Sequence, residues 1–167
     1  MSLKKLFPGV DTDVPEIVVT IPFIDVPPGT PVPTDEIQFP PYAQHFNMDS
    51  AIKAHTGGAF GASDVSSVKI KQIIFTIINP DSLNNLSNFE SARFTFKSNS
   101  NSVPLSIASF NFSDTYAATT TYIAPANTPE LRSYLDGTEL TYTVYGKLRR
   151  YTTKSIKFSV NITLRVK

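Results

Sequence analysis

The C-terminal segment of the chain constrains its fold more than any other part. From position 156 to 166 apolar and polar residues alternate without interruption, and the apolar ones are Ile156, Phe158, Val160, Ile162, Leu164 and Val166. Successive side chains of a β-strand point to opposite faces, so this period of two predicts a strand with one buried face. An opposing layer must cover that face, and a second sheet can supply it.

Shorter stretches with strand character precede this segment. They cover residues 68–78, 92–97, 105–112, 115–123 and 140–148, and polar turns separate them. The first stretch begins with outward lysines and then becomes apolar on both faces, which predicts a central strand lying under a cover. Strands joined by short polar turns predict an all-β fold, an antiparallel two-sheet sandwich of the immunoglobulin-like kind.

Two short helices are expected outside these strands. An N-cap residue, Asn47 or Asp49, and a later pair of glycines predict a helix over residues 48–55. Residues 127–137 carry a second signature, a capping Thr128 followed directly by a proline. Two leucines of this second helix would close one end of the sandwich.

The N-terminal part of the chain is rich in proline. Nine of the thirteen prolines lie before residue 42, and proline lacks the backbone N–H that a central strand needs. We therefore expect only a short edge strand at residues 16–21, followed by an extended, Pro-rich strap at residues 27–33. Four apolar residues would hold the strap to the body: Ile37, Phe39, Tyr42 and Phe46.

The length of 167 residues fits one folded unit. We divide it into a Pro-rich segment, residues 1–41, that packs on or leads into the body, and a β-sandwich domain, residues 42–167. The net charge is +1 with interspersed signs, which argues against nucleic-acid binding. The absence of Cys excludes disulfides and thiolate metal sites. No apolar run reaches the ~18 residues that would span a bilayer.

Composition and the first residues bear on the compartment. Charged residues make up 17% of the chain against an ordinary ~25%, while Ser, Thr and Asn are abundant, as in many secreted proteins. The start, Met1 to Pro8, begins like a signal peptide but forms no apolar core. The protein is either cytoplasmic, with Met1 as its native start, or exported, with its signal removed. We expect the second, and hence an extracytoplasmic location.

Two short motifs resemble uncharacterised surface lipoproteins of the Bacteroidota type. They lie at residues 84–92 (Asn-Asn-Leu-Ser-Asn-Phe-Glu-Ser-Ala) and 131–138 (Leu-Arg-Ser-Tyr-Leu-Asp-Gly-Thr), and the similarity covers about the last hundred residues. The resemblance implies a β-sandwich, export and lipid anchoring at an outer-membrane surface, with no known activity. The lipid-bearing Cys of such proteins is absent from this chain, and no functional residues carry over.

Candidate metal ligands are few. His45, Asp49 and His55 form the only His-containing cluster in the sequence. Two His and one Asp provide few ligands for a metal ion, so we favour a structural or surface role. Asp11 and Asp13 begin like a calcium loop but lack its glycine and distal glutamate, so solvated charges are favoured there. We therefore expect no metal and no cofactor.

Catalysis has little support in the sequence. No Gly-x-Ser-x-Gly elbow occurs, and two histidines leave few triad options. The carboxylates lie mostly in expected turns, and nothing marks two of them as a pair for glycoside cleavage. The chain is therefore predicted not to be an enzyme.

The candidate ligand-binding residues are Tyr145 and Tyr151 with the neighbouring Arg149 and Arg150. Exposed rings flanked by donors can stack on a sugar or contact a protein. The alternative, which we favour, is cross-strand packing of tyrosine on threonine.

Together these features predict a non-catalytic, cell-surface structural or protein-interaction module. It would bind a protein partner or a second copy through a sheet edge or the N-terminal strap. The alternative function is a carbohydrate- or small-ligand-binding sandwich that uses the tyrosines and arginines above.

Overall fold

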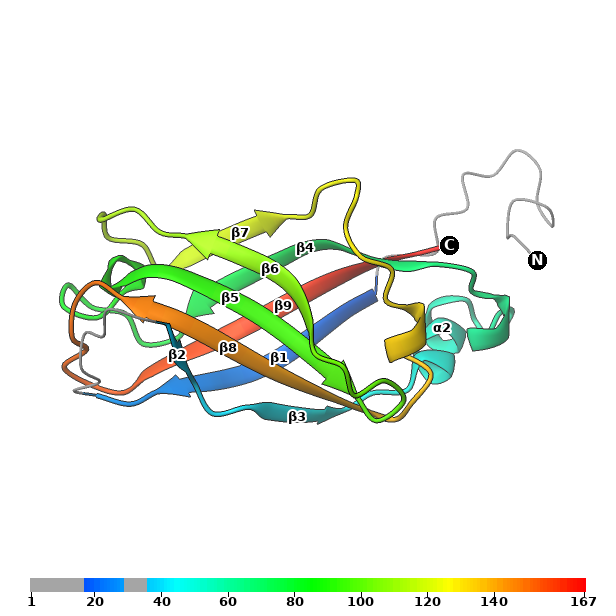
Figure 1. Cartoon of the computed structure of the whole chain (residues 1–167). Coiled ribbons are helices and arrows are strands. Elements are labelled where there is room, and N and C mark those ends of the chain that lie inside the picture. The colour runs from blue at the N-terminus through cyan, green and yellow to red at the C-terminus, as the bar shows by residue number, and fades with distance from the viewer. Residues whose placement is uncertain (1–16, 29–35) are drawn as a thin grey trace.

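The computed structural model describes residues 17–28 and 36–167, and within them two antiparallel sheets face each other around one hydrophobic core (Figure 1). One sheet has the order β1 (Ile17–Val26), β9 (Ile156–Val166), β4 (Val68–Ile77) and β7 (Thr119–Ile123). The other has the order β8 (Glu139–Leu148), β5 (Phe89–Ser98) and β6 (Leu105–Asn111); β2 (Ile37–Gln38) and β3 (Tyr42–His45) both pair with β8. The predicted antiparallel two-sheet sandwich is confirmed.

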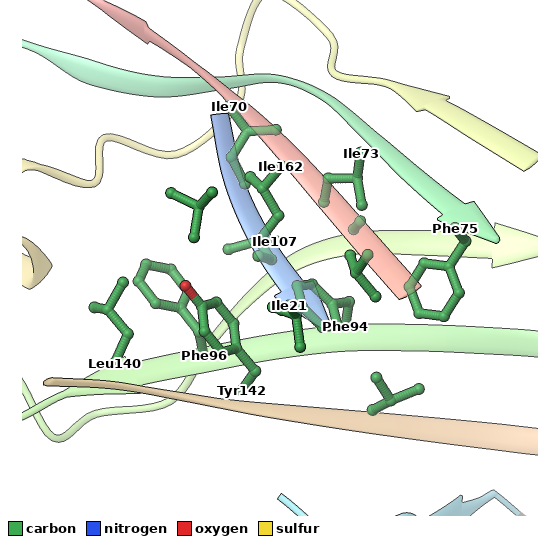
Figure 2. Packing of buried hydrophobic residues seen from close by; sticks show 14 of the residues in the cluster. Ile21, Ile70, Ile73, Phe75, Phe94, Phe96, Ile107, Leu140, Tyr142 and Ile162 are labelled. Carbon is green, nitrogen blue, oxygen red and sulfur yellow. The ribbon is translucent and has the colours of Figure 1, made fainter. Parts of the chain in front are cut away.

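The core is built from the inward positions of the alternating strands. In β9 every apolar position from Ile156 to Val166 is buried, as the sequence predicts. Phe75 of β4 lies in edge contact with Phe94 and Phe158, so a single ring touches residues of both sheets. Figure 2 shows inward side chains of the two layers meeting between the ribbons. Each large apolar side chain buried in this way contributes roughly 1.5–3 kcal/mol to folding.

Strand β4 differs from its prediction because it contains a bulge. Ile70 pairs with Leu164 and Gln72 pairs with Thr163, so Lys71 is an extra residue without a partner across the ladder. The inward positions are Val68 and Ile70 before the bulge and Ile73, Phe75 and Ile77 after it. The strand is central, but the expected cover over its second face is wrong: that face is only half-buried up to Thr76, and Ile78 beyond it is 53% exposed.

The first predicted helix is confirmed. Helix α2 spans Met48–His55, and the Asn47 side chain accepts a hydrogen bond from the Ser50 N–H as its N-cap. Gly57 and Gly58 follow with φ of 61° and 83°, a conformation that favours glycine.

The second predicted helix, residues 127–137, is wrong. Only one 3-10 turn, η3 (Arg132–Tyr134), forms there, besides η1 (Ala62–Asp64) and η2 (Leu86–Asn88) elsewhere. Long-range hydrogen bonds hold this segment instead: the Leu131 N–H donates to the Val68 carbonyl oxygen at 2.8 Å, and the Val68 N–H donates to the Glu130 carboxylate at 2.6 Å, so residues 130 and 131 are tied to the start of β4. Leu131 is nevertheless buried at the end of the core, as the leucine pattern predicts.

The N-terminal segment joins both sheets. Strand β1 is longer than expected and lies at a sheet edge, where it pairs with β9. Phe39 is buried, and its ring lies so close to Gly146 that a Cβ there would sit 2.7 Å from it. The other three apolar residues named for the strap, Ile37, Tyr42 and Phe46, are half-buried against the core. Residues 29–35 lie outside the described part of the chain, so the strap itself stays a prediction.

Helices of the described part are short. None of them has the length and apolar character needed to cross a membrane.

Candidate functional site

Tyr145, the first predicted site residue, lies on the outer face of the second sheet, opposite Arg93 of β5. The Arg93 guanidinium carbon lies 4.1 Å from the centre of the Tyr145 ring, and the same guanidinium pairs with Glu36 at 2.8 Å. One face of the ring is therefore occupied by a neighbouring strand. A shallow hollow of about 180 Å³ lies beside it, with Thr95 and Thr143 among its lining residues.

Arg149 and Arg150 bind the loop that precedes β5. Arg149 donates to the carbonyl oxygens of Ser87 at 3.0 Å, Phe89 at 3.2 Å and Phe112 at 2.9 Å. Arg150 donates to the Ser87 carbonyl oxygen at 3.0 Å and pairs with a carboxylate oxygen of Asp114 at 2.5 Å. These guanidinium groups hold loops of the fold together, so their role is structural.

Tyr151 has an exposed ring, with 59% of the residue accessible, in the loop after β8. Its carbonyl oxygen accepts a hydrogen bond from the buried Asn88 side chain at 2.9 Å. The structure thus brings the two arginines together on Ser87 and places Tyr151 next to them in the chain. It places Tyr145 apart from them, within β8.

The arginines belong to a polar cluster that we call the asparagine hub: Asn84, Asn85, Asn88, Arg149 and Arg150. Its three asparagines are buried, with at most 2% of each exposed. They hydrogen-bond the loop 78–88 to itself and to the loop 149–155. The Arg150 hydrogen bond is the main cause that lowers the pKa of Asp114 beside the hub.

Two members of the His and Asp cluster, Asp49 and His55, contact groups in helix α2 and in the segment that follows it. Asp49 accepts a hydrogen bond from the Ala62 N–H at 2.8 Å and pairs with Lys53 at 2.6 Å. The His55 Nδ1 atom lies 2.9 Å from the Ala51 carbonyl oxygen. Over residues 17–28 and 36–167 no three His, Cys, Asp or Glu side chains gather in a metal-binding arrangement. Asp11 and Asp13 lie outside the described residues.

Strand β7 is an open sheet edge. Toward β4, the Ile77 N–H donates to the Ala118 carbonyl oxygen and the Ala124 N–H donates to the Lys71 carbonyl oxygen. Backbone groups alternate in direction along a strand, so Thr119, Thr121 and Ile123 direct their N–H and C=O groups away from β4. Within the described part of the chain these groups have no hydrogen-bond partner.

The other described edges carry features that hinder pairing. Strand β1 contains Pro22 and a shift of register between Ile21 and Ile24. Strands β2 and β3 are short and are separated by two prolines. Strand β6 has a bulge at Ile107. In contrast, β7 has no bulge, and neither a proline nor a charge interrupts the run from Thr115 to Ala124. Prolines, bulges and charges are the usual protection of sheet edges.

A second site, absent from the sequence predictions, lies where β4 begins and β9 ends. We call it the basic hollow. Its volume is about 530 Å³, and its lining residues include Lys69, Lys71, Arg165 and Lys167. Residues Ala124, Pro125, Ala126 and Thr128, which follow β7, form another part of its wall. The signal was present in the outward positions of Lys69, Lys71 and Arg165, but only the pairing of β4 with β9 brings them together.

No protein-family model matches the chain, and no curated protein sequence shows significant similarity to it.

Proposed function

We propose that this protein is a non-catalytic interaction module that associates with a second copy of itself through strand β7. The single observation that carries the proposal is the open β7 edge, whose outward backbone groups lack partners within the described residues. Unpaired strand edges bind other strands through main-chain hydrogen bonds.

The sequence of β7 suits pairing with itself. In an antiparallel arrangement about a twofold axis at Thr121, that residue faces its own copy and Thr119 faces Ile123 of the second copy. These are the residues whose N–H and C=O groups point outward, so the register would satisfy them all. The segment from Thr115 to Pro129 contains no charged residue, so no like charges would meet across the contact.

The finer features of the sequence prediction belong to the same proposal. An extracytoplasmic, cell-surface location and lipid anchoring are supported by the polar, weakly charged composition and by the lipoprotein resemblance. The immunoglobulin-like description is proposed at the level of architecture. In a constant-type immunoglobulin domain the last two strands share a sheet, whereas here β9 lies with β1 and β4, opposite β8.

Carbohydrate binding is the second candidate. The exposed ring of Tyr151, which directly follows the two arginines, is the observation that favours it. Glycan-array binding that disappears in Tyr151→Ala would support this function, and an empty array would contradict it.

Sedimentation of the full chain over a wide concentration range tests self-association. We expect a monomer–dimer equilibrium that Thr121→Pro abolishes, because proline removes the outward N–H without removing a bond to β4. The matched control is Thr121→Val, which keeps that N–H and the strand preference and should keep the dimer. A monomer at every concentration, or a dimer that survives Thr121→Pro, would overturn the proposal.

A further inference from the structure

The basic hollow holds positive charges that face one another. Lys69 of β4 and Arg165 of β9 are directly opposite in the antiparallel ladder, and both point to the outer face of the sheet. Like charges in such cross-strand positions destabilise a sheet. Lys71 and Lys167 add two further cations to the lining of the same hollow. The fold therefore concentrates positive charge at a place where that charge is unfavourable by itself.

Most of the described basic residues outside the hollow have a carboxylate partner. Seven of them form ion pairs with carboxylates: Lys53, Arg93, Arg132, Lys147, Arg149, Arg150 and Lys154. Lys69, Arg165 and Lys167 form none with the residues that the structure describes, and none of the described residues that line the hollow is acidic. Their charges are available to a ligand.

The carboxylate of Glu130, which follows the wall segment, lies next to the lining residue Ser67, but its oxygens are already occupied by donors. It accepts hydrogen bonds from the Ser67 hydroxyl and the Val68 N–H, each at 2.6 Å, and from the N–H groups of Leu131 and Arg132. Burial acts to raise its pKa, but these donors outweigh burial and lower it. Its negative charge is thus held by the backbone at the start of β4.

The lining also has an apolar side. Four further lining residues are apolar, Ile123, Ala124, Pro125 and Ala126, and Ile123 is 68% exposed. The space of about 530 Å³ is larger than an inorganic anion requires. A fitting ligand would combine an anionic group with a compact apolar part. Guanidinium and ammonium groups together favour phosphate, which accepts several charge-assisted hydrogen bonds.

We infer that the basic hollow is a binding site for phosphate monoesters, with Arg165 and Lys69 holding the phosphate and Ile123 and Pro125 contacting the organic part. Ile123 takes part in both proposals, with its side chain in the hollow and its backbone in strand addition. The tests change different residues, Lys69 and Arg165 for the hollow and Thr121 for the dimer, so the two proposals can fail separately.

Isothermal titration of the full chain with phenyl phosphate tests the inference. We expect binding that is tighter than that of inorganic phosphate and that weakens as salt is added. Arg165→Gln and Lys69→Gln should each weaken it by about 10- to 100-fold, as for the loss of one charge-assisted hydrogen bond. The matched control is Lys97→Gln, an exposed β5 lysine that removes the same charge far from the hollow in the other sheet and should leave binding unchanged.

Thermal unfolding distinguishes a ligand site from a structural one. Lys69→Gln relieves the cross-strand repulsion, so its melting temperature should equal or exceed that of the parent while binding is lost. If both variants bind phenyl phosphate like the parent, or if Lys97→Gln weakens it equally, the inference is overturned.

Sedimentation with vesicles separates two sources of the phosphate group. Binding of phenyl phosphate together with vesicles of phosphatidic acid in phosphatidylcholine assigns a lipid headgroup. Binding of phenyl phosphate alone assigns a soluble ester. Binding of neither, in the soluble titration and in the vesicle assay, overturns the inference.

Discussion

The cations at the two ends of strand β4 differ in whether they have partners within the chain. At its C-terminal end, in the asparagine hub, Arg149 and Arg150 donate to carbonyl oxygens of Ser87, Phe89 and Phe112 and approach Asp114. At its N-terminal end, in the basic hollow, Lys69 and Arg165 face each other without a carboxylate of the described chain as partner. Figure 1 shows these ends at opposite sides of the sandwich.

This difference separates structural cations from candidate ligand-binding cations. A guanidinium that satisfies several buried carbonyl oxygens is required by the fold, and removing it leaves those acceptors without a donor. A cation that faces only another cation costs stability, which makes it a candidate for binding a ligand outside the chain. The arginines singled out in the sequence belong to the first kind, and the residues that the sequence did not single out belong to the second.

The largest effect is expected from Asn88→Ala in the hub. Its buried side chain donates to the carbonyl oxygens of Leu83 and Tyr151, both at 2.9 Å, and accepts from the Asn85 N–H at 3.0 Å. Leaving these groups unpaired should lower the free energy of unfolding by about 3 kcal/mol. Urea denaturation measures the change, with the exposed Asn127→Ala as the control expected to stay within ~0.5 kcal/mol. If the two variants have equal free energies of unfolding, the hydrogen bonds of Asn88 do not stabilise the fold.

A pair of arginine variants sharpens the comparison directly. Arg149→Ala should lower the free energy of unfolding by about 2 kcal/mol, because three carbonyl oxygens lose a charged donor. Arg165→Ala should change it by less than ~0.5 kcal/mol, because that side chain has no hydrogen bond or ion pair with the described residues. Both values come from urea titrations under one set of conditions. If Arg165→Ala lowers the free energy of unfolding as much as Arg149→Ala does, the cations at the two ends of β4 do not differ in their contribution to stability.

The smallest effect is a pH dependence at the hub end. The Lys154 hydrogen bond, and then that of Asn84, lower the pKa of Asp81 from 3.8 to about 2. A carboxyl with a lowered folded pKa stabilises the protein fully above its unfolded pKa, and this stabilisation is lost as the pH falls through the folded pKa. Melting temperatures should therefore fall less between pH ~4 and pH ~2 in Asp81→Asn than in the parent.

The Lys154→Gln variant tests the cause of this shift. Since the Lys154 hydrogen bond contributes most to this shift, the melting temperature of this variant should also fall less between pH ~4 and pH ~2 than that of the parent. Superimposable curves for the parent and both variants would show that Asp81 does not contribute.

Local pattern was sufficient to predict most strands but not their neighbours. The alternation in Ile156 to Val166 specifies a strand and its buried face, and both are confirmed. The helix expected at residues 127–137 does not form, and this segment is instead tied to Val68, 63 residues away from Leu131, through the Leu131 N–H and the Glu130 carboxylate. No signal near Leu131 indicates such a distant partner, since propensity and capping describe only neighbours in the chain.

The candidate sites show the same limit. Arg149 and Arg150 looked available because their acceptors, such as the Phe112 carbonyl oxygen, lie on a distant segment. Lys69 and Arg165 were each predicted to point outward, yet their meeting depends on β4 and β9 being adjacent, and periodicity does not determine strand order.

The bulge at Lys71 has a consequence for how this strand tolerates change. Without that residue, the order Val68, Lys69, Ile70, Gln72, Ile73 would still alternate between core and solvent in perfect phase, and Phe75 would keep its place. The hydrophobic interior therefore does not need Lys71. The hollow does, because Lys71 lines it and its carbonyl oxygen accepts the Ala124 N–H that fixes the start of the wall segment after β7. A one-residue deletion at this position would therefore spare the core while it removes a cation from the hollow.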